Sequence, residues 1–334
     1  MSAKGRPERE QAPERVSAKG PMRAKGRPER EQAPERASAK GRSITGRRAD
    51  RWWTLAPAVI LFVAVALVPI GELIAMSVSQ IDWVRGKAQW RFVGFDQYAR
   101  VLGDPLFRTG VTNTLVFAIA GVAVQMVLGF ALALLTTKVA RGRLVYRTVF
   151  ILPILVPGIV IGAIWKLMYN FDFGVLNQLL GVFGMRPIDW LGSTATALAA
   201  VIAVDVWHWT PFVFLLMLAG LESLPQDVYE AARVDGATFL QELRYVTLPL
   251  MLPAIVVTML FRILVGVKVF DEIYLLTGGG PGTATEVVSY TIFRRFFTEG
   301  QTGYGSAMSV VVLFAIAFVF IAARGLTERR RASA

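Results

Sequence analysis

The chain has 334 residues, of which 54% are apolar and only 18% are charged, whereas soluble proteins average about 25% charged residues. It has no cysteine and a single histidine, which excludes disulfides, thiolate metal sites and clusters of histidine ligands. The net charge of +12 is concentrated in residues 1–51, which hold 15 basic and 7 acidic side chains. A basic arm ahead of a membrane segment explains this charge better than nucleic-acid binding does.

The basic arm is a tandem repeat, because residues 1–21 and 22–42 differ at only three positions. With so few apolar side chains it cannot offset the entropy of ordering, so we expect residues 1–51 to be a disordered cytoplasmic tail. Binding to anionic lipid headgroups is one role for it, but the composition favours a solvated extension without a role. Met22 occupies the place of Met1 in the second copy, which leaves the true start open. No apolar stretch follows the charges closely enough for a signal peptide.

Six apolar runs of about 20 residues are candidate membrane-spanning helices. They are Leu55–Val78, Val111–Thr137, Thr148–Tyr169, Thr196–Gly220, Ala254–Leu276 and Ser306–Ala323. An inside N-terminus places 15 Lys and Arg residues near the cytoplasmic span ends and 8 in the opposite loops. This bias predicts cytoplasmic N- and C-termini, although Arg85, Lys87 and Arg91 weaken it in the first outer loop.

The connection between the fourth and fifth runs, residues 221–253, is too polar to enter the bilayer. Pro225 lies near the first turn of a short helix, where its missing N–H is tolerated, and Gly236 permits a sharp change of direction. A second short helix over Ala237–Tyr245 has its apolar side chains largely on one face, and Thr247–Pro249 ends it. This pattern indicates either a hairpin that docks on another surface or a plain connection between two spans.

The same loop resembles the EAA loop of binding-protein-dependent ABC importer permeases, Glu-Ala-Ala-x3-Gly-x9-Ile-x-Leu-Pro, with Val246 in place of the usual Ile. The resemblance implies an all-α integral membrane protein with six transmembrane helices and the type I ABC importer permease (MetI-like) fold. The permease domain then spans residues 52–325, followed by a cytoplasmic tail, 326–334. In the family this loop is a coupling helix that lies in a groove of a cytoplasmic ATPase subunit. The residues that take this ATPase-coupling role by resemblance are Glu230, Ala231, Ala232, Asp235, Gly236, Leu248 and Pro249.

Further segments resemble the carbohydrate-type branch of these permeases, namely residues 92–98, 207–212, 275–286 and 303–305. The resemblance implies a subunit that forms half of the pathway for a sugar, a polyol or a glycerol phosphate in a bacterial inner membrane. It also implies three kinds of partner: a second homologous permease, a dimer of ATP-binding subunits, and a periplasmic or lipoprotein solute-binding protein. Independently of the resemblance, the residue types of Gly278–Pro281 predict a flexible turn that ends a helix.

The chain lacks a Gly-x4-Gly-Lys-Ser/Thr phosphate-binding loop, so energy must come from another polypeptide or from an ion gradient. An ion-coupled carrier usually shows repeated spans, and the only repeat is in the tail. A membrane enzyme needs a set of polar groups at membrane depth, and the candidates are few and dissimilar. We therefore expect a non-catalytic subunit without a cofactor or a metal site.

Ionisable side chains within the apolar runs are costly and are therefore candidates for function. They are Glu72, Lys166, Asp205, Arg262, Lys268, Asp271 and Glu272. Lys268 and Glu272 lie one helical turn apart and are predicted to pair, whereas Asp205 shares a face with His208 and is placed to meet Arg262 or Lys268. Pairing that fixes helix packing and lining of a hydrophilic path are both open, and the structural role is favoured for any one residue.

Aromatic side chains near these charges either stack on a sugar ring or anchor and pack helices. The candidates for the substrate pathway are Asp205, Trp207, Trp209, Lys268 and Tyr274.

Overall fold

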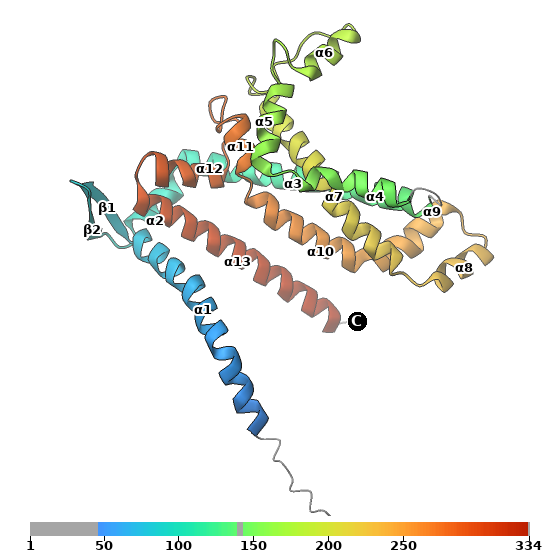
Figure 1. The fold of residues 1–334 in the computed structure, drawn as a ribbon, viewed down its shortest axis with the longest axis horizontal. Helices are drawn as coiled ribbons and strands as arrows, with labels where there is room; N and C mark the ends of the chain where they lie inside the picture. The colour runs from blue at the N-terminus through green and yellow to red at the C-terminus, as the bar shows by residue number, and fades with distance from the viewer. Residues whose placement is uncertain (1–45, 139–142, 333–334) are drawn as a thin grey trace, which may run out of the picture. The chain divides into compact units, whose positions relative to one another are not determined.

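A computed structural model describes residues 46–138 and 143–332 (Figure 1). The chain divides into two units, residues 1–59 and residues 60–334. Helix α1 (Gly46–Ser77) already includes residues 46–51, which the composition places in the disordered tail. The rest of that predicted tail lies outside the described residues.

A two-stranded antiparallel hairpin follows α1 and departs from the predicted all-α fold. It consists of β1 (Ser79–Val84) and β2 (Lys87–Phe92), joined by a two-residue turn in which Arg85 and Gly86 have φ angles of 50° and 76°. Two positive φ angles are typical of the tight turns whose twist matches that of the strands. Helix α2 (Asp96–Gly103) then leads into α3 (Pro105–Lys138).

Helices α3, α7 (Ala197–Glu222) and α10 (Leu248–Val267) form the central packing. The first two approach closely at Gly129, where an added Cβ would lie 2.7 Å from a side-chain carbon of Val213. A glycine is required here because a larger residue would push the helices apart. The apolar side chains buried between α3, α7 and α10 include Ala133, Phe214 and Met251.

The predicted third span is bent rather than straight. Helix α4 (Arg143–Ile151) continues through the 3₁₀ turn η1 (Leu152–Leu155), and α5 (Gly158–Met168) then departs at 96°. The break falls at Val156 and Pro157, because the residue before a proline is disfavoured in the helical conformation. Val156 accordingly has extended dihedral angles.

The predicted fifth span is also wrong in its bounds at both ends. At one end, α10 stops at Val267, and a separate helix α11 (Asp271–Leu276) begins after a break of three residues. At the other end, α9 (Phe239–Gln241) and the π turn η2 (Glu242–Thr247) run directly into α10, so Thr247–Pro249 does not end a helix. The π turn lies where Pro249 cannot donate the usual backbone hydrogen bond, and such bulges accommodate that loss.

The remaining described elements are α6 (Val175–Val182), α8 (Gln226–Val234), α12 (Val288–Phe293), the π turn η3 (Arg294–Thr298) and α13 (Thr302–Ala332). Among the described residues, four helices are long and apolar enough to cross a membrane, and the bent pair α4–α5 makes a fifth. Residues 302–318 of α13 form a shorter apolar stretch.

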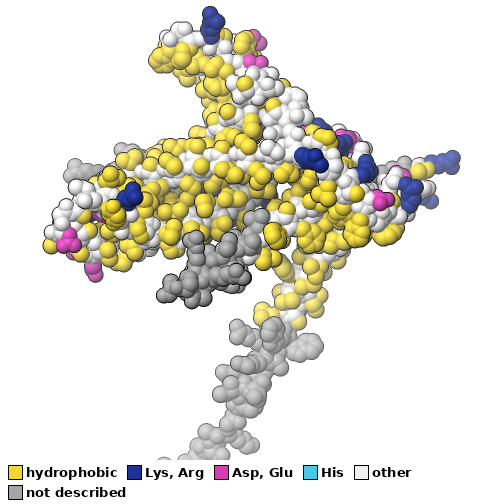
Figure 2. All heavy atoms as spheres, turned by 180° about the vertical axis from the view of Figure 1, so that it is seen from behind, with side chains coloured by type: hydrophobic (Ala, Val, Ile, Leu, Met, Phe, Trp, Pro, Cys, Tyr) yellow, Lys and Arg dark blue, Asp and Glu magenta, His cyan; other side chains and the backbone are white. Residues whose placement is uncertain are grey.

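Large apolar side chains cover the visible helix surfaces (Figure 2), with Ile119 64% and Val127 68% exposed. Such extensive apolar exposure is expected where lipid or another membrane subunit replaces water.

Candidate coupling loop and intramembrane polar site

The segment between α7 and α10 folds as a hairpin of two short helices, and the chain changes direction between them at Gly236. Helix α8 ends at Val234, and Gly236 has a φ of 76° with nothing within 4 Å of an added Cβ. A glycine at this position ends the helix with little strain, since side chains rarely adopt positive φ. Thr238 and Gln241 then form a capping box that starts α9, with a 2.8 Å hydrogen bond from the Thr238 backbone N–H to the Gln241 amide oxygen.

The hairpin is held together by few contacts and presents its apolar side chains outward. Arg233 lies 3.6 Å from Glu242, and the Tyr229 hydroxyl donates to Thr247 over 3.2 Å. No residue of α8 is buried. Val234 is 87% and Leu240 69% exposed, so two large apolar side chains of the hairpin are uncovered.

The predicted coupling residues divide between the two ends of this hairpin. Glu230, Ala231, Asp235 and Gly236 are exposed on α8 and its turn, and Ala232 is partly buried. Leu248 and Pro249 are exposed in the first turn of α10, where the hairpin joins that helix.

Helices α3, α7 and α10 are joined by a buried polar network. The Arg262 guanidinium donates to the Asp205 carboxylate over 3.1 Å and to the Gln125 amide oxygen over 2.8 Å. Gln125 donates in turn to the same carboxylate over 2.7 Å. Arg262 is fully buried and also lies 4.5 Å from the centre of the Trp209 ring. The predicted pairing of Asp205 with Arg262 is therefore confirmed, and the three helices are held in register.

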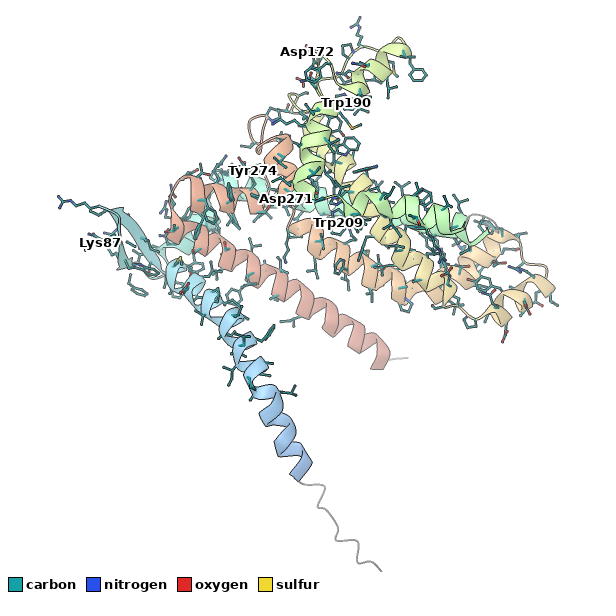
Figure 3. The ribbon with its side chains drawn as sticks, viewed as in Figure 1. Lys87, Asp172, Trp190, Trp209, Asp271 and Tyr274 are labelled. Atoms are coloured by element: carbon teal, nitrogen blue, oxygen red, sulfur yellow. The ribbon has the colours of Figure 1, made fainter. Side chains whose placement is uncertain are left out.

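A polar cavity of about 340 Å³ opens beside this network. Its walls come from α5, α7 and the break between α10 and α11, and include Asp205, Trp209 and Lys268 from the predicted pathway residues. Asp271, labelled in Figure 3 with Trp209, also lines it and packs against Gly158, whose added Cβ would lie 3.0 Å from the carboxylate. Among the described residues, no three His, Asp or Glu side chains gather as metal ligands.

Two predicted pathway residues lie elsewhere. Trp207 is 42% exposed and packs edge-on against Trp165 beside an apolar cavity. Tyr274 is 47% exposed and stacks on Phe270, as part of an aromatic cluster that continues onto α12 (Figure 3).

The predicted pairing of Lys268 with Glu272 is wrong, because the helix breaks between them. Glu272 instead meets His208, with 3.4 Å between a carboxylate oxygen and Nδ1. Both side chains are buried and line the polar cavity. Gln125 is a residue that sequence reasoning missed, and its polar side chain within a long apolar run was the available signal.

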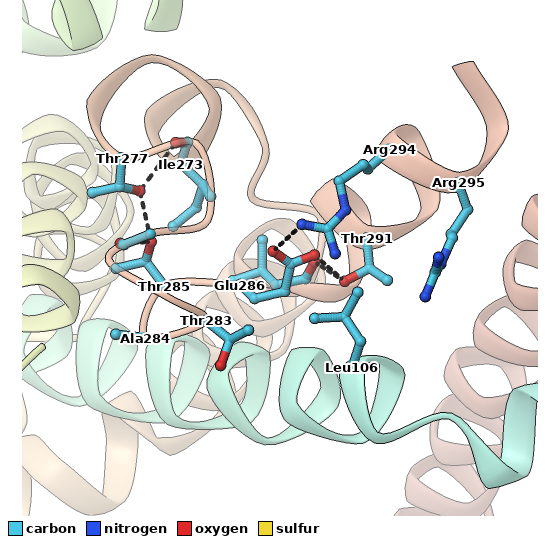
Figure 4. A network of polar contacts seen from close by, with 12 residues as sticks. Leu106, Ile273, Thr277, Thr283, Ala284, Thr285, Glu286, Thr291, Arg294 and Arg295 are labelled. Atoms are coloured by element: carbon cyan, nitrogen blue, oxygen red, sulfur yellow. Dashed lines mark hydrogen bonds and ion pairs between the residues drawn. The ribbon is translucent and has the colours of Figure 1, made fainter. Parts of the chain in front are cut away.

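The glycine-rich segment after α11 is tightly fastened, in contrast to the predicted flexible turn. The Thr285 hydroxyl donates to the Gly280 carbonyl over 2.7 Å, and its oxygen lies 2.6 Å from the Thr277 hydroxyl (Figure 4). The two N–H groups of the Asn113 amide on α3 lie within hydrogen-bonding distance of the backbone carbonyls of Thr283, Ala284 and Glu286. The segment is therefore a fixed element of the fold rather than a loose linker.

Glu286 is fully buried at the end of this segment. Thr291 donates to its carboxylate over 2.7 Å, and Arg294 lies 3.4 Å away (Figure 4). Burial raises the pKa of Glu286, and these two partners oppose that shift only in part. Gly279 makes room for the carboxylate, since its added Cβ would lie 2.4 Å from it.

The arrangement defines a class of protein: a helical membrane protein with an exposed polar hairpin and a polar cavity between its helices. Residues 94–332 match the family described as binding-protein-dependent transport system inner membrane component. The chain belongs to this family.

Three relatives illustrate the branch. The trehalose/maltose transport system permease protein MalF of Thermococcus litoralis is 40% identical over 66% of this chain and 74% of its own. The trehalose transport system permease protein SugA of Mycobacterium tuberculosis is 35% identical over 84% of this chain and 91% of its own. The sulfoquinovosyl glycerol transport system permease protein SmoG of Agrobacterium fabrum is 33% identical over 77% of this chain and 83% of its own.

The fold matches that of a chain in the crystal structure of a bacterial ABC transporter that imports the acidic polysaccharide alginate. The TM-score is 0.73 with 23% sequence identity, over 85% of this chain and 98% of the other. The chain therefore has the type I ABC importer permease fold.

Proposed function

We propose that this chain is the permease subunit of an ABC importer and forms half of the membrane pathway for a sugar, a polyol or a glycerol phosphate. The observation that carries the proposal is the exposed hairpin with the Glu230–Pro249 spacing, in a family whose named relatives transport trehalose, maltose and sulfoquinovosyl glycerol. The permease has no catalysis of its own, and a separate ATPase supplies the energy.

The proposed topology has six membrane crossings with both termini in the cytoplasm. Four apolar helices, the bent pair α4–α5 and the apolar part of α13 supply the six. The excess of Lys and Arg near the cytoplasmic ends supports this orientation. It puts the hairpin α8–α9 in the cytoplasm and the strands β1 and β2 on the outer face.

The proposed partners are a second homologous permease, a dimer of ATP-binding subunits and a solute-binding protein on the outer face. Exposed side chains such as Val234 and Leu240, with Glu230 and Asp235, form the ATPase-coupling surface. Because α9, η2 and α10 run on without a break, a displacement of the hairpin reaches the fifth span directly. The continuous helix then acts as a lever that opens the pathway to one side or the other. Solute shifts this equilibrium only through its different affinities for the two states.

The substrate pathway is assigned to the polar cavity beside the Asp205 network. Trp209 supplies an aromatic face, while Lys268 and Asp271 supply polar groups. Trp207 and Tyr274 are kept as pathway residues because both are partly exposed, so the second permease is able to complete a site around them.

Uptake into vesicles that contain both permeases and the ATPase tests the proposal. We expect uptake of the solute to require ATP and the binding protein and to persist when the ion gradient is dissipated. Uptake that collapses with an uncoupler yet continues without the ATPase would show an ion-coupled carrier instead.

A variant pair tests the coupling loop. Gly236→Pro forces φ to about −65° where the chain needs 76°, so co-purification with the ATPase should be lost while membrane insertion is retained. Gly184→Pro is the matched control, since Gly184 has a φ of 70° with equally open surroundings but lies in the α6–α7 connection. If Gly236→Pro still binds the ATPase, the loop is not the coupling site.

A further inference from the structure

A second polar cavity lies apart from the intramembrane site, between β1, α2 and the start of α13. It has a volume of about 350 Å³, which is within the range of small-molecule sites. Eight of its lining side chains carry hydrogen-bonding groups: Gln80, Asp82, Gln97, Arg100, Glu299, Gln301, Thr302 and Tyr304. We call it the outer cleft, following the proposed orientation of the chain. Its composition is typical of a site for a polar ligand.

Several donors in the outer cleft have no partner. Gln97 is only 5% exposed, and its amide oxygen accepts from Arg100, but its amide nitrogen donates to none of the described residues. The Thr302 hydroxyl is a buried atom without a hydrogen-bond partner. Leaving the buried Thr302 hydroxyl unsatisfied is costly, and together with the Gln97 amide nitrogen it points to a ligand that accepts hydrogen bonds. The first backbone N–H groups of α13, which no preceding helical turn can satisfy, lie at the same wall.

The charges around the outer cleft nearly cancel. Arg100 stands against Asp82 and Glu299, and Glu299 is itself paired with Arg295 over 2.6 Å. An anionic ligand would face the two carboxylates, and a cationic ligand would face Arg100 and the positive end of α13. An uncharged ligand with many hydroxyl groups avoids both penalties, because each hydroxyl both donates and accepts.

The cleft is preformed. Gly303 brings the start of α13 against β1, and an added Cβ there would lie 2.1 Å from the Ser79 carbonyl oxygen. The Tyr304 hydroxyl donates to Asp104 over 2.8 Å, and the Arg100 guanidinium lies 4.6 Å from the centre of the Tyr304 ring. These contacts hold the walls of the cleft in place. Because its side chains need not be ordered when a ligand binds, the entropy cost of binding is smaller.

We propose that the outer cleft binds an uncharged saccharide or polyol through Gln97, Arg100, Thr302 and the N-terminal end of α13, as a site separate from the intramembrane cavity. The proposal rests on the proposed function for its class of solute and for the outer position of the cleft. A solute held there is close to the membrane pathway before it enters.

Saturation-transfer NMR tests the proposal on the assembled transporter in nanodiscs, with the binding protein left out. Trehalose, maltose and sorbitol are the probes. We expect saturation transfer to at least one of them, and a Kd raised about fivefold for each hydrogen bond removed in Gln97→Met and Thr302→Val. The double variant Gln178→Met with Thr298→Val makes the same chemical changes outside the cleft and should bind as the unmodified chain does. Arg100→Met, at an exposed position, provides a variant that does not depend on repacking a buried side chain.

Three results would overturn the proposal: no saturation transfer to any of the three probes, transfer unchanged in all the cleft variants, or transfer lost in Trp209→Ala. The last result would move the binding to the intramembrane cavity. If the second result is obtained and the cleft variants also lose the binding protein when it is added back, the cleft receives a protein side chain rather than a solute. Failure of ATP-dependent uptake by the unmodified transporter is the separate result that would refute the proposed function.

Discussion

Replacing Arg262 by methionine should strongly destabilise the packing of α3, α7 and α10. The guanidinium is fully buried, 3.1 Å from the Asp205 carboxylate and 2.8 Å from the Gln125 amide oxygen. Methionine removes the positive charge, so the carboxylate is left buried and unpaired. Breaking one partner of a buried ion pair costs about 3–5 kcal/mol.

Removing both charges should recover much of this loss. In Asp205→Leu with Arg262→Met, no buried charge remains, and Gln125 keeps its 3.1 Å hydrogen bond to the backbone carbonyl of residue 205. Its amide oxygen loses its donor, which leaves a cost of about 1–3 kcal/mol. The double variant should therefore be more stable than Arg262→Met alone.

Unfolding in mixed micelles, followed by tryptophan fluorescence, measures both variants, and Trp209 beneath the guanidinium serves as a local reporter. Asp205→Asn keeps the shape of the side chain but removes its charge and turns one acceptor oxygen into a donor, so it leaves the buried Arg262 guanidinium without a counter-ion and should also destabilise the packing. Two results would refute this prediction: a loss of less than about 1 kcal/mol in the free energy of unfolding of Arg262→Met, or a double variant that is no more stable than Arg262→Met.

Three further predictions concern the outer segments. Gly279→Ala should lower the melting temperature more than Gly282→Ala does. Both glycines have positive φ, but an added Cβ meets a buried carboxylate only at Gly279. Equal shifts in melting temperature would contradict this prediction. Asn113→Leu removes the amide that donates to the backbone carbonyls of this segment, so amide exchange between residues 283 and 286 should accelerate with a local loss of about 1–3 kcal/mol. Unchanged exchange would show that the segment is stable without Asn113. Burial and the hydrogen bond to Asp104 raise the pKa of Tyr304 to about 12, so its stabilisation is present below pH 10 and lost as the pH rises through 12. Tyrosine ring-carbon NMR should show this phenol titrating at lower pH in Asp104→Asn, and an unmoved titration would exclude the carboxylate as a cause.

The sequence predicted the class of protein because its signals are local. Apolar length located the membrane segments, and the spacing from Glu230 to Pro249 located the helical hairpin that we propose as the coupling loop. A positive φ at Gly236 follows from the need to reverse direction between two short helices. The hairpin β1–β2 was missed although Arg85–Gly86 lies between two short runs with aromatic and apolar residues, since two short strands give a weak signal beside long apolar helices.

The charged residues within the spans show where local reasoning stops. A regular helix would pair Lys268 with Glu272, but the break after Val267 turns Glu272 toward His208. Apolar content says nothing about such breaks, because a bent segment and a straight one have the same mean hydropathy. The bend at Pro157 was not predicted, although the sequence contains a signal for it, because the residue before a proline is disfavoured in a helix.

The sequence by itself thus determined that the chain is a membrane permease with a polar loop between its fourth and fifth apolar runs, because hydropathy and motif spacing depend on residues close together in the chain. Only the tertiary structure decided which polar groups meet: Gln125 with Asp205 and Arg262, and three separate segments around the outer cleft. The physical reason is that a buried polar group must find its partner wherever packing brings one. In the chain, Arg262 is 57 residues from Asp205 and 137 residues from Gln125.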